Sequence, residues 1–504
     1  MRKLFFLVFL CAAGSAMAQK IPNPKPFAKT ITAEELKTHL YIVAGPEMEG
    51  RETATDGERK AAAYIEKHFR EYGVQPGFNG SYYMPFPVYQ DSVISSGIEV
   101  NGKAFKADED FSIFPGTAAT STLLSGEVVY VGAGTITDSK NSYEGVDARG
   151  KVVLVFPAAP AAGAQQQRRV NPTTAIVEAA AKNGAAAILV VSPMFPRRAS
   201  GAVGGLTTNA YRKVITPNLY YISENIAREI MGEDAATAKN ATAASAKAYP
   251  VELKLEFRKE TNKLIANNVL GVIEGTDLKD EYLVLTAHYD HNGKRGDSVI
   301  FYGADDDGSG TVAILELAQA FAEAKKSGKG PRRSILFMCV SGEEKGLWGS
   351  AYYGDNPVFP LEKTTANLNI DMIGRTDPER TKGDSSNYVY VVGDDKLSTD
   401  LRPISEAMNK KYTKMELDYK FNDPNDPMRI YFRSDHYNFA RHGVPIIFYF
   451  NGTHADYHRP TDTPDKINYP LLAKRAHLIF YTAWEMANRN DMLKRDLTLE
   501  IPQR

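Results

Sequence analysis

Short apolar runs separated by longer amphipathic stretches recur through the second half of the chain. The apolar runs are typical of strands buried on both faces of a sheet. Between them, stretches such as 311–325 have the spacing of helices. This alternation predicts an α/β fold: a mostly parallel mixed sheet sandwiched by helices. The predicted strands are Val269–Ile273, Tyr282–Ala287, Ile335–Val340, Leu368–Ile370 and Ile446–Phe450.

The first half of the chain divides into two parts of different texture. Within residues 30–75, Ala62, Ile65 and Phe69 form a helical apolar stripe that Gly73 would end. Residues 92–254 instead predict a smaller α/β domain of their own, with elements at Val128–Val131, Val152–Val155, Thr173–Lys182 and Ala187–Val191. We therefore expect one main domain from residues 19–91 and 255–490, an inserted domain at 92–254, and a C-terminal tail at 491–504.

The first residues predict a secretory signal peptide, residues 1–18. Arg2 and Lys3 precede an apolar run, and small residues end it at Ala18. The run is shorter than the ~20 residues that span a bilayer, so we expect an exported protein without a transmembrane segment in the mature chain. After cleavage Cys339 is the only cysteine, which excludes an intrachain disulfide and predicts a core residue.

Composition adds two limits. A chain of 504 residues is too long for one compact core, in agreement with the two expected domains. A formal net charge of −1 gives no reason to expect nucleic acid as a partner. Oligomeric state is not readable from either property.

Metal-ligand residue types follow the predicted strands. In an α/β sheet, ligands bind beyond the carboxyl ends of strands. Imidazoles and carboxylates in such a place suit a pair of divalent ions, with one carboxylate bridging them. The candidates are His288, Asp306, Glu343, Glu344, Asp371 and His458.

Two parts of this sequence pattern also have a simpler interpretation that needs no metal. Asp290 lies on the same side of its strand as His288 and could orient that imidazole, or could belong to a solvated turn. The acidic triplet 305–307 could merely cap a helix. Glu343 and Glu344 are different, because adjacent carboxylates at a strand end need a cation or a shared proton. One of them would then bind metal and the other would transfer protons.

In this order, the segments resemble the co-catalytic dizinc aminopeptidases, relatives of glutamate carboxypeptidase and the transferrin receptor. The resemblance covers about 255–490 and, more weakly, 30–75. The segments that carry it are Ala287–Asp290, Gly303–Gly310, Ser341–Glu344, Asp371–Met372 and His458–Thr463, with Glu49–Arg51 near the start. The insert is similar to a protease-associated (PA) domain, through Val128–Val131, Tyr143–Asp147 and Gly150–Val155.

The resemblance implies two Zn²⁺ ions and a role for each residue. It implies that His288 and Asp371 hold one ion, that Glu344 and His458 hold the other, and that Asp306 bridges them. It further implies Glu343 as general base, Tyr457 as a group that stabilises the oxyanion, and a cis peptide between Asp306 and Asp307.

The expected function is therefore a zinc exopeptidase acting on peptides, in the first place an aminopeptidase. A carboxypeptidase or dipeptidase of the same family is the alternative, and Arg433 would then bind the substrate carboxylate unless it pairs with Asp435. A glutaminyl cyclase would use a single zinc ion. A metal-free binding protein would have lost ligands, whereas this sequence retains all five and Glu343.

Overall fold

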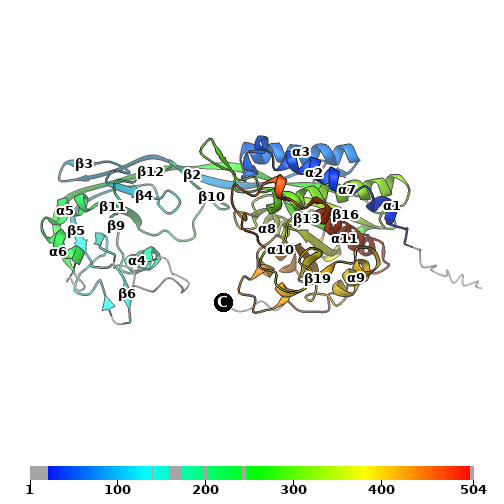
Figure 1. The fold of residues 1–504 in the computed structure, drawn as a ribbon. Helices are drawn as coiled ribbons and strands as arrows, with labels where there is room; N and C mark the ends of the chain where they lie inside the picture. The colour runs from blue at the N-terminus through cyan, green and yellow to red at the C-terminus, as the bar shows by residue number, and fades with distance from the viewer. Residues whose placement is uncertain (1–20, 139, 158–171, 198–200, 241–245, 500–504) are drawn as a thin grey trace, which may run out of the picture. The chain divides into compact units, whose positions relative to one another are not determined.

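The computed structural model describes all residues except 1–20, 139, 158–171, 198–200, 241–245 and 500–504. The expected signal peptide therefore lies outside the described residues. The chain forms two compact units (Figure 1). Unit 1 combines the residues up to Phe86 with those from Ile265 onward, and unit 2 is Pro87–Leu264. The insert expected from the sequence, 92–254, falls inside unit 2.

Unit 1 contains the predicted mostly parallel mixed sheet. Its strand order is β19-β18-β20-β17-β13-β16-β12. The four central strands pair in parallel, while β12 joins β16 and β18 joins β20 in antiparallel fashion. The strands are β12 (Lys247–Ile273), β13 (Leu278–His288), β16 (Arg333–Val340), β17 (Thr364–Ile370), β18 (Tyr388–Val392), β19 (Glu416–Asp418) and β20 (Ile446–Phe450).

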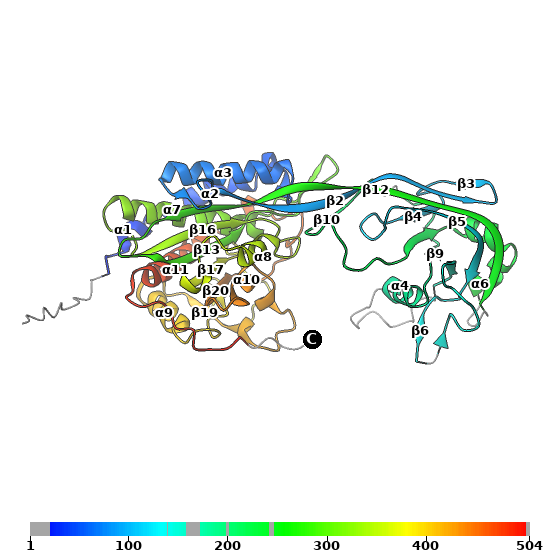
Figure 2. The ribbon, with the colours of Figure 1, turned by 180° about the vertical axis from the view of Figure 1, so that it is seen from behind.

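Both faces of this sheet are buried, which is why its strands are continuous apolar runs. Side chains alternate along β16: Ile335, Phe337 and Cys339 join one core, and their neighbours join the other. The predicted core position of Cys339 is confirmed. Helices α2, α3, α7 and α11 cover the first face, and α8 and α10 contribute to the core of the second (Figure 2). They are α2 (Ala33–Val43), α3 (Asp56–Tyr72), α7 (Gly310–Lys326), α8 (Trp348–Asp355), α10 (His436–Ala440) and α11 (Tyr469–Asn488).

Helix α3 shows how local sequence positions the segment before it. The Thr55 side chain accepts a hydrogen bond from the Glu58 backbone N–H and caps the first turn. Gly73, at φ 82°, ends the helix as predicted. Packing through Ile65 and Phe69 holds α3 against the sheet, and this places residues 49–53 beside the carboxyl ends of the strands.

In unit 2 the strands β5, β8, β9 and β11 pair in parallel. Helix α4 packs on one of its cores, and α5 and α6 pack on the other. Their bounds are β5 (Ser121–Tyr130), β8 (Val152–Val155), β9 (Ala187–Val191), β11 (Asn218–Ile222), α4 (Pro172–Lys182), α5 (Glu224–Met231) and α6 (Asp234–Asn240).

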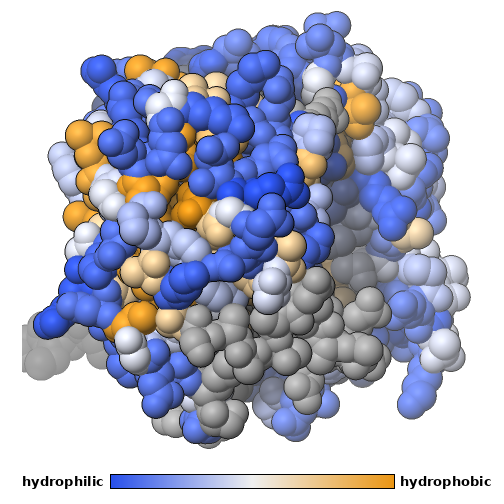
Figure 3. Space-filling model, turned by 90° about the vertical axis from the view of Figure 1, so that its left-hand side faces the viewer, coloured by the Kyte–Doolittle hydropathy of each residue, from blue (hydrophilic) through white to orange (hydrophobic). Residues whose placement is uncertain are grey.

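Strand β12 is much longer than the predicted Val269–Ile273. Its first part pairs with β5 in unit 2 and its last part with β16 in unit 1. The first part was missed because polar and apolar residues alternate there, as expected of a strand with one exposed face. Figure 3 shows a largely hydrophilic face with apolar side chains in small groups. Among the described residues, none of the helices is sufficiently long and apolar for a membrane span.

Candidate metal centre

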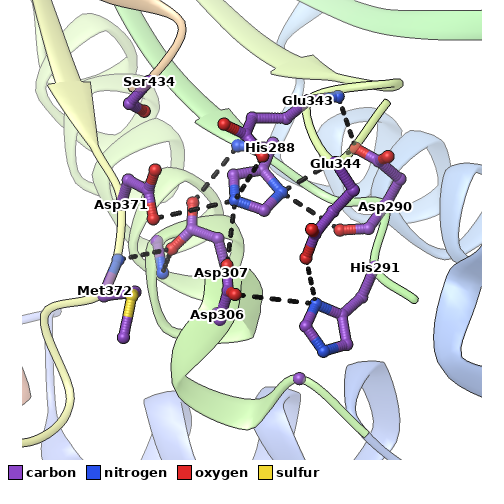
Figure 4. A network of polar contacts seen from close by, with 12 residues as sticks. His288, Asp290, His291, Asp306, Asp307, Glu343, Glu344, Asp371, Met372 and Ser434 are labelled. Atoms are coloured by element: carbon purple, nitrogen blue, oxygen red, sulfur yellow. Dashed lines mark hydrogen bonds and ion pairs between the residues drawn. The ribbon is translucent and has the colours of Figure 1, made fainter. Parts of the chain in front are cut away.

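The predicted ligands meet at one edge of the unit 1 sheet (Figure 4). His288 is the last residue of β13, Glu344 follows β16, and Asp371 directly follows β17. Because these three strands are parallel neighbours, their carboxyl ends lie side by side. Asp306 reaches the same place from η3 (Ala304–Ser309), the turn that precedes α7, and His458 arrives from the segment after β20.

The first group of donors consists of His288, Asp306 and Asp371. The His288 Nε2 atom lies 3.2 Å from Asp306 Oδ1 and 3.7 Å from Asp371 Oδ1. All three side chains are buried. The other ring nitrogen, Nδ1, lies 3.0 Å from the Asp290 main-chain oxygen. This contact turns Nε2 toward the carboxylates, as in most histidine metal sites.

The second group lies on the other side of Asp306. The His458 Nε2 atom is 3.1 Å from Asp306 Oδ2 and 3.1 Å from Glu344 Oε2. His291 Nδ1 is 2.6 Å from Glu344 Oε1 and 3.9 Å from Asp306 Oδ2. Asp306 thus directs one oxygen to each group, the arrangement required of a bridging carboxylate. The sequence-based prediction did not include His291, although its place three residues after His288 at the same strand end is a usable signal.

Asp290 lies beside His288, the imidazole that it is predicted to orient. Its carboxylate lies 3.8 Å from His288 Nδ1, beyond hydrogen-bonding distance, and the main-chain oxygen holds the imidazole instead. The carboxylate accepts hydrogen bonds from the Thr53 hydroxyl, at 2.8 Å, and from the Glu343 backbone N–H, at 3.2 Å. Strand geometry gives the side of the sheet but not the conformation of the turn after β13, so the contact with the Glu343 backbone was not predicted. Asp290 thus lies near His288 and also holds the Glu343 backbone N–H.

Burial and the neighbouring charges shift the pKa values of several side chains in this site. Burial raises the pKa of Glu343 well above its usual range, and the neighbouring Asp371 carboxylate adds to the effect. Burial lowers the pKa of His288, but the Glu343 and Asp371 carboxylates outweigh it, so the pKa is raised well above its ordinary value. For His458 the Asp306 and Glu344 carboxylates likewise outweigh burial and raise the pKa to about 10. Such a cluster is stabilised by cations.

The donor atoms fit a pair of divalent ions. Among the described residues, four of these buried atoms have no hydrogen-bond partner: His288 Nε2, His291 Nδ1, Asp306 Oδ2 and Glu344 Oε1. Buried polar atoms without partners are costly, so a set of them that converges on one point fits a bound cation. The groups His288–Asp306–Asp371 and His291–Asp306–Glu344 each bring their ligand atoms within 4.8 Å of one another. Imidazole and carboxylate donors in this number suit zinc.

Two residues, Arg51 and Asp307, hold together the segments that carry the predicted ligands, and neither belongs to the donor groups. Arg51 is fully buried and donates hydrogen bonds to the main-chain oxygens of Val43, Tyr289, Tyr302 and Gly303. It thereby ties the end of β13 to the loop that carries Asp306. The sequence marked Arg51 only as part of a weak resemblance, because three of its four acceptors lie 238 to 252 residues away in the chain.

Asp307 joins three further segments. Its carboxylate accepts hydrogen bonds from the backbone N–H groups of His288, Gly310 and Met372. The acidic triplet therefore has divided roles: Asp306 faces the donor groups, and Asp307 fastens the helix start to two strand ends. The peptide bond between them is cis, as the resemblance implied.

A pocket opens beside the donor groups. Tyr457 lies in its wall, and the Tyr457 hydroxyl accepts a hydrogen bond of 3.2 Å from Arg433 Nη2. Arg433 does not pair with Asp435, whose buried carboxylate instead accepts a hydrogen bond from the Ser350 hydroxyl. The pocket is lined by Asp306, Glu343, Asp371, Met372, Ile430, Arg433, Phe448, Phe450, Thr453 and Tyr457.

Fold and site together are those of an α/β protein with two adjoining groups of metal-ligand residues. The sequence pattern of peptidase family M28 matches residues 268–483, which carry every predicted ligand. The segment of unit 1 that holds the site is therefore similar to this peptidase family. This confirms the family that the motifs resembled.

Individual relatives agree with this family. A protein of Arabidopsis thaliana named as a probable glutamate carboxypeptidase is 35% identical over 123 residues, which are 24% of this chain and 17% of that protein. A probable zinc metalloprotease of Pyricularia oryzae is 27% identical over 263 residues, 44% of this chain and 50% of that protein. The chain thus spans half or less of these curated relatives. The solved aminopeptidase from Aneurinibacillus sp. strain AM-1 shares the fold, with a TM-score of 0.54 and 18% identity over 96% of this chain and 100% of that one.

Proposed function

We propose that this protein is an exported zinc aminopeptidase that removes N-terminal residues from peptides. The observation that carries the proposal is the pair of donor groups that share Asp306, with Glu343 beside them. When bound, a zinc pair supplies Lewis-acid polarisation of a carbonyl and lowers the pKa of water toward neutrality. His288 and Asp371 would hold one ion, Glu344 and His458 the other, and Asp306 both.

The remaining chemistry belongs to protein side chains. The Glu343 carboxylate accepts a proton from the attacking water and returns it to the departing amine. Its raised pKa suits both duties, because a very weak base would not take the proton and a very strong one would not release it. The Asp290 carboxylate fixes the Glu343 backbone N–H for this task. The Tyr457 hydroxyl donates a hydrogen bond to the developing oxyanion, and Arg433 keeps that hydroxyl at the pocket wall.

The same pocket favours a carboxypeptidase as the second candidate. Arg433 lines it and, among the described residues, makes no ion pair, so its guanidinium can bind a free carboxylate. The acids in the pocket, including Glu343 and Asp371, favour a free amine instead. One relative of this chain is named as a probable glutamate carboxypeptidase and another as an aminopeptidase. The names of the relatives therefore favour neither activity over the other.

One digestion experiment separates the candidates. The zinc-loaded protein is incubated with a peptide library in which half of the N-termini are acetylated, and the products are identified by mass spectrometry. Stepwise trimming confined to free N-termini supports the aminopeptidase. Trimming from the C-terminus refutes it and assigns the carboxypeptidase, and absence of any cleavage refutes both.

Export is a separate part of the proposal and rests on the predicted leader, residues 1–18. Its test is N-terminal sequencing of the protein produced in a bacterial host. A chain that starts at Gln19 outside the cytoplasm supports export. Unit 2 remains predicted to be a PA domain, and both donor groups found among the described residues lie in unit 1.

A further inference from the structure

We propose that His291 is a fourth protein ligand of the ion held by Glu344 and His458, which makes the two metal sites unequal. This inference rests on the proposed dizinc function, because it assigns one more residue of this chain to that centre. Nothing in the sequence motifs assigns His291 to the site.

The first support is the convergence of unsatisfied atoms. His291 Nδ1, Glu344 Oε1 and Asp306 Oδ2 are buried, and none has a hydrogen-bond partner among the described residues. His291 Nδ1 faces both carboxylates, at 2.6 Å and 3.9 Å (Figure 4). In a tetrahedral zinc site with bonds near 2.0–2.2 Å, ligand atoms lie about 3.3–3.6 Å apart, a spacing that the observed distances bracket.

The second support is the way the fold holds the ring. His291 is fully buried, and its backbone N–H donates to the Arg51 main-chain oxygen. Gly303, at φ 55°, lies against the ring, and a Cβ atom at Gly303 would come within 2.5 Å of it. Gly303, at the start of the loop that carries Asp306, thus leaves room for the His291 imidazole.

The two donor groups then differ in number and exposure. His288, Asp306 and Asp371 provide three donors to the first site. Four residues surround the second site: Asp306, His291, Glu344 and His458. His458 is 42% exposed at its side chain, whereas His291 is completely buried. We expect the four-donor site to fill first and to release its ion last, since it offers one more protein ligand than the first site.

The decisive experiment uses the unaltered protein. X-ray absorption spectroscopy of the fully zinc-loaded chain counts imidazoles per zinc ion. Three imidazoles shared by two ions, His288, His291 and His458, give an average of 1.5, and two imidazoles give 1.0. A value near 1.5 supports the proposal. Two bound zinc ions with a value of 1.0 overturn it and leave the proposed function intact, whereas a chain that binds no zinc overturns both.

A variant gives an independent measurement. In His291→Asn we expect the more tightly bound zinc to weaken by more than about 100-fold in chelator competition, beyond the 10–100-fold typical of residues that only orient a ligand. His442→Asn serves as the control, because His442 is exposed and faces Asp355 on the surface. A His291→Asn protein that unfolds like the unaltered apoprotein but keeps zinc within 10-fold contradicts the assignment.

Discussion

Replacing Arg51 with methionine tests whether one buried guanidinium holds the ligand-bearing segments together. Methionine retains most of the side-chain length but donates no hydrogen bond. The substitution removes the bonds of 2.7–2.9 Å to the main-chain oxygens of Val43, Tyr289, Tyr302 and Gly303. These acceptors are the end of β13, the loop before α7 and the end of α2, so we expect both stability and metal binding to suffer.

The magnitude follows from two opposing terms. Four hydrogen bonds from a charged donor, at the lower value of about 1.5 kcal/mol each, contribute roughly 6 kcal/mol. Burial lowers the pKa of Arg51 to about 10 from its ordinary 12.5. At about 1.4 kcal/mol for each tenfold change, burial of this cation costs roughly 3.5 kcal/mol. We therefore expect Arg51→Met to reduce the free energy of unfolding of unit 1 by about 2.5 kcal/mol.

Urea unfolding followed by tryptophan fluorescence measures this change. Both tryptophans, Trp348 and Trp484, lie in unit 1, so the signal reports that unit alone. The control is Arg59→Met, since Arg59 is exposed and its ion pair with Asp56 lies on the surface of α3, where such pairs contribute little to stability. If the free energy of unfolding of Arg51→Met is within 1 kcal/mol of that of the unaltered protein, Arg51 does not hold these segments together.

Three further predictions concern charge. Glu343→Gln should fold and keep both zinc ions but lose at least about 10³-fold in kcat, the scale of general-base catalysis; near-normal kcat would remove Glu343 from that role. Asp306→Asn should hold fewer than two zinc ions by elemental analysis, because both donor groups lose a shared anion. Burial raises the pKa of Glu316, a carboxyl of α7 that lies 3.4 Å from His39 Nε2, to about 8. The unfolded-state value is near 4.5, so unaltered protein should lose stability as pH rises between about 4.5 and 8. Glu316→Gln should remove this dependence and gain up to roughly 5 kcal/mol above pH 8, measured by urea unfolding; a gain that does not change with pH would refute the assignment.

Several features of the fold were predictable because they depend on local physics. The strands β13, β16 and β20 have apolar runs with both faces buried and could be identified from them. The part of β12 in unit 2 was not predicted, because one of its faces is exposed. The short strand β19 (Glu416–Asp418) has no apolar run at all, and only its pairing with β18 makes it a strand.

The metal centre shows the same division. Four of its predicted ligands, His288, Asp306, Glu344 and Asp371, could be proposed from sequence because each ends or follows a recognisable strand or precedes a helix, and parallel strands bring such positions together. The contact of His291 Nδ1 with Glu344, the hydrogen bond from the Glu343 backbone to Asp290, and the four acceptors of Arg51 could not. Each depends on turn conformations and on segments up to 252 residues apart in the chain.

The sequence by itself thus determined the α/β class, the resemblance to dizinc peptidases and the residues able to bind metal. These follow from residue type and from periodicity along one strand or helix. The tertiary structure decided which nitrogen faces which oxygen, which buried atoms lack partners and which side chains only hold others in place. Those properties are distances between atoms of separate segments, and only the packing of both sheet faces sets them.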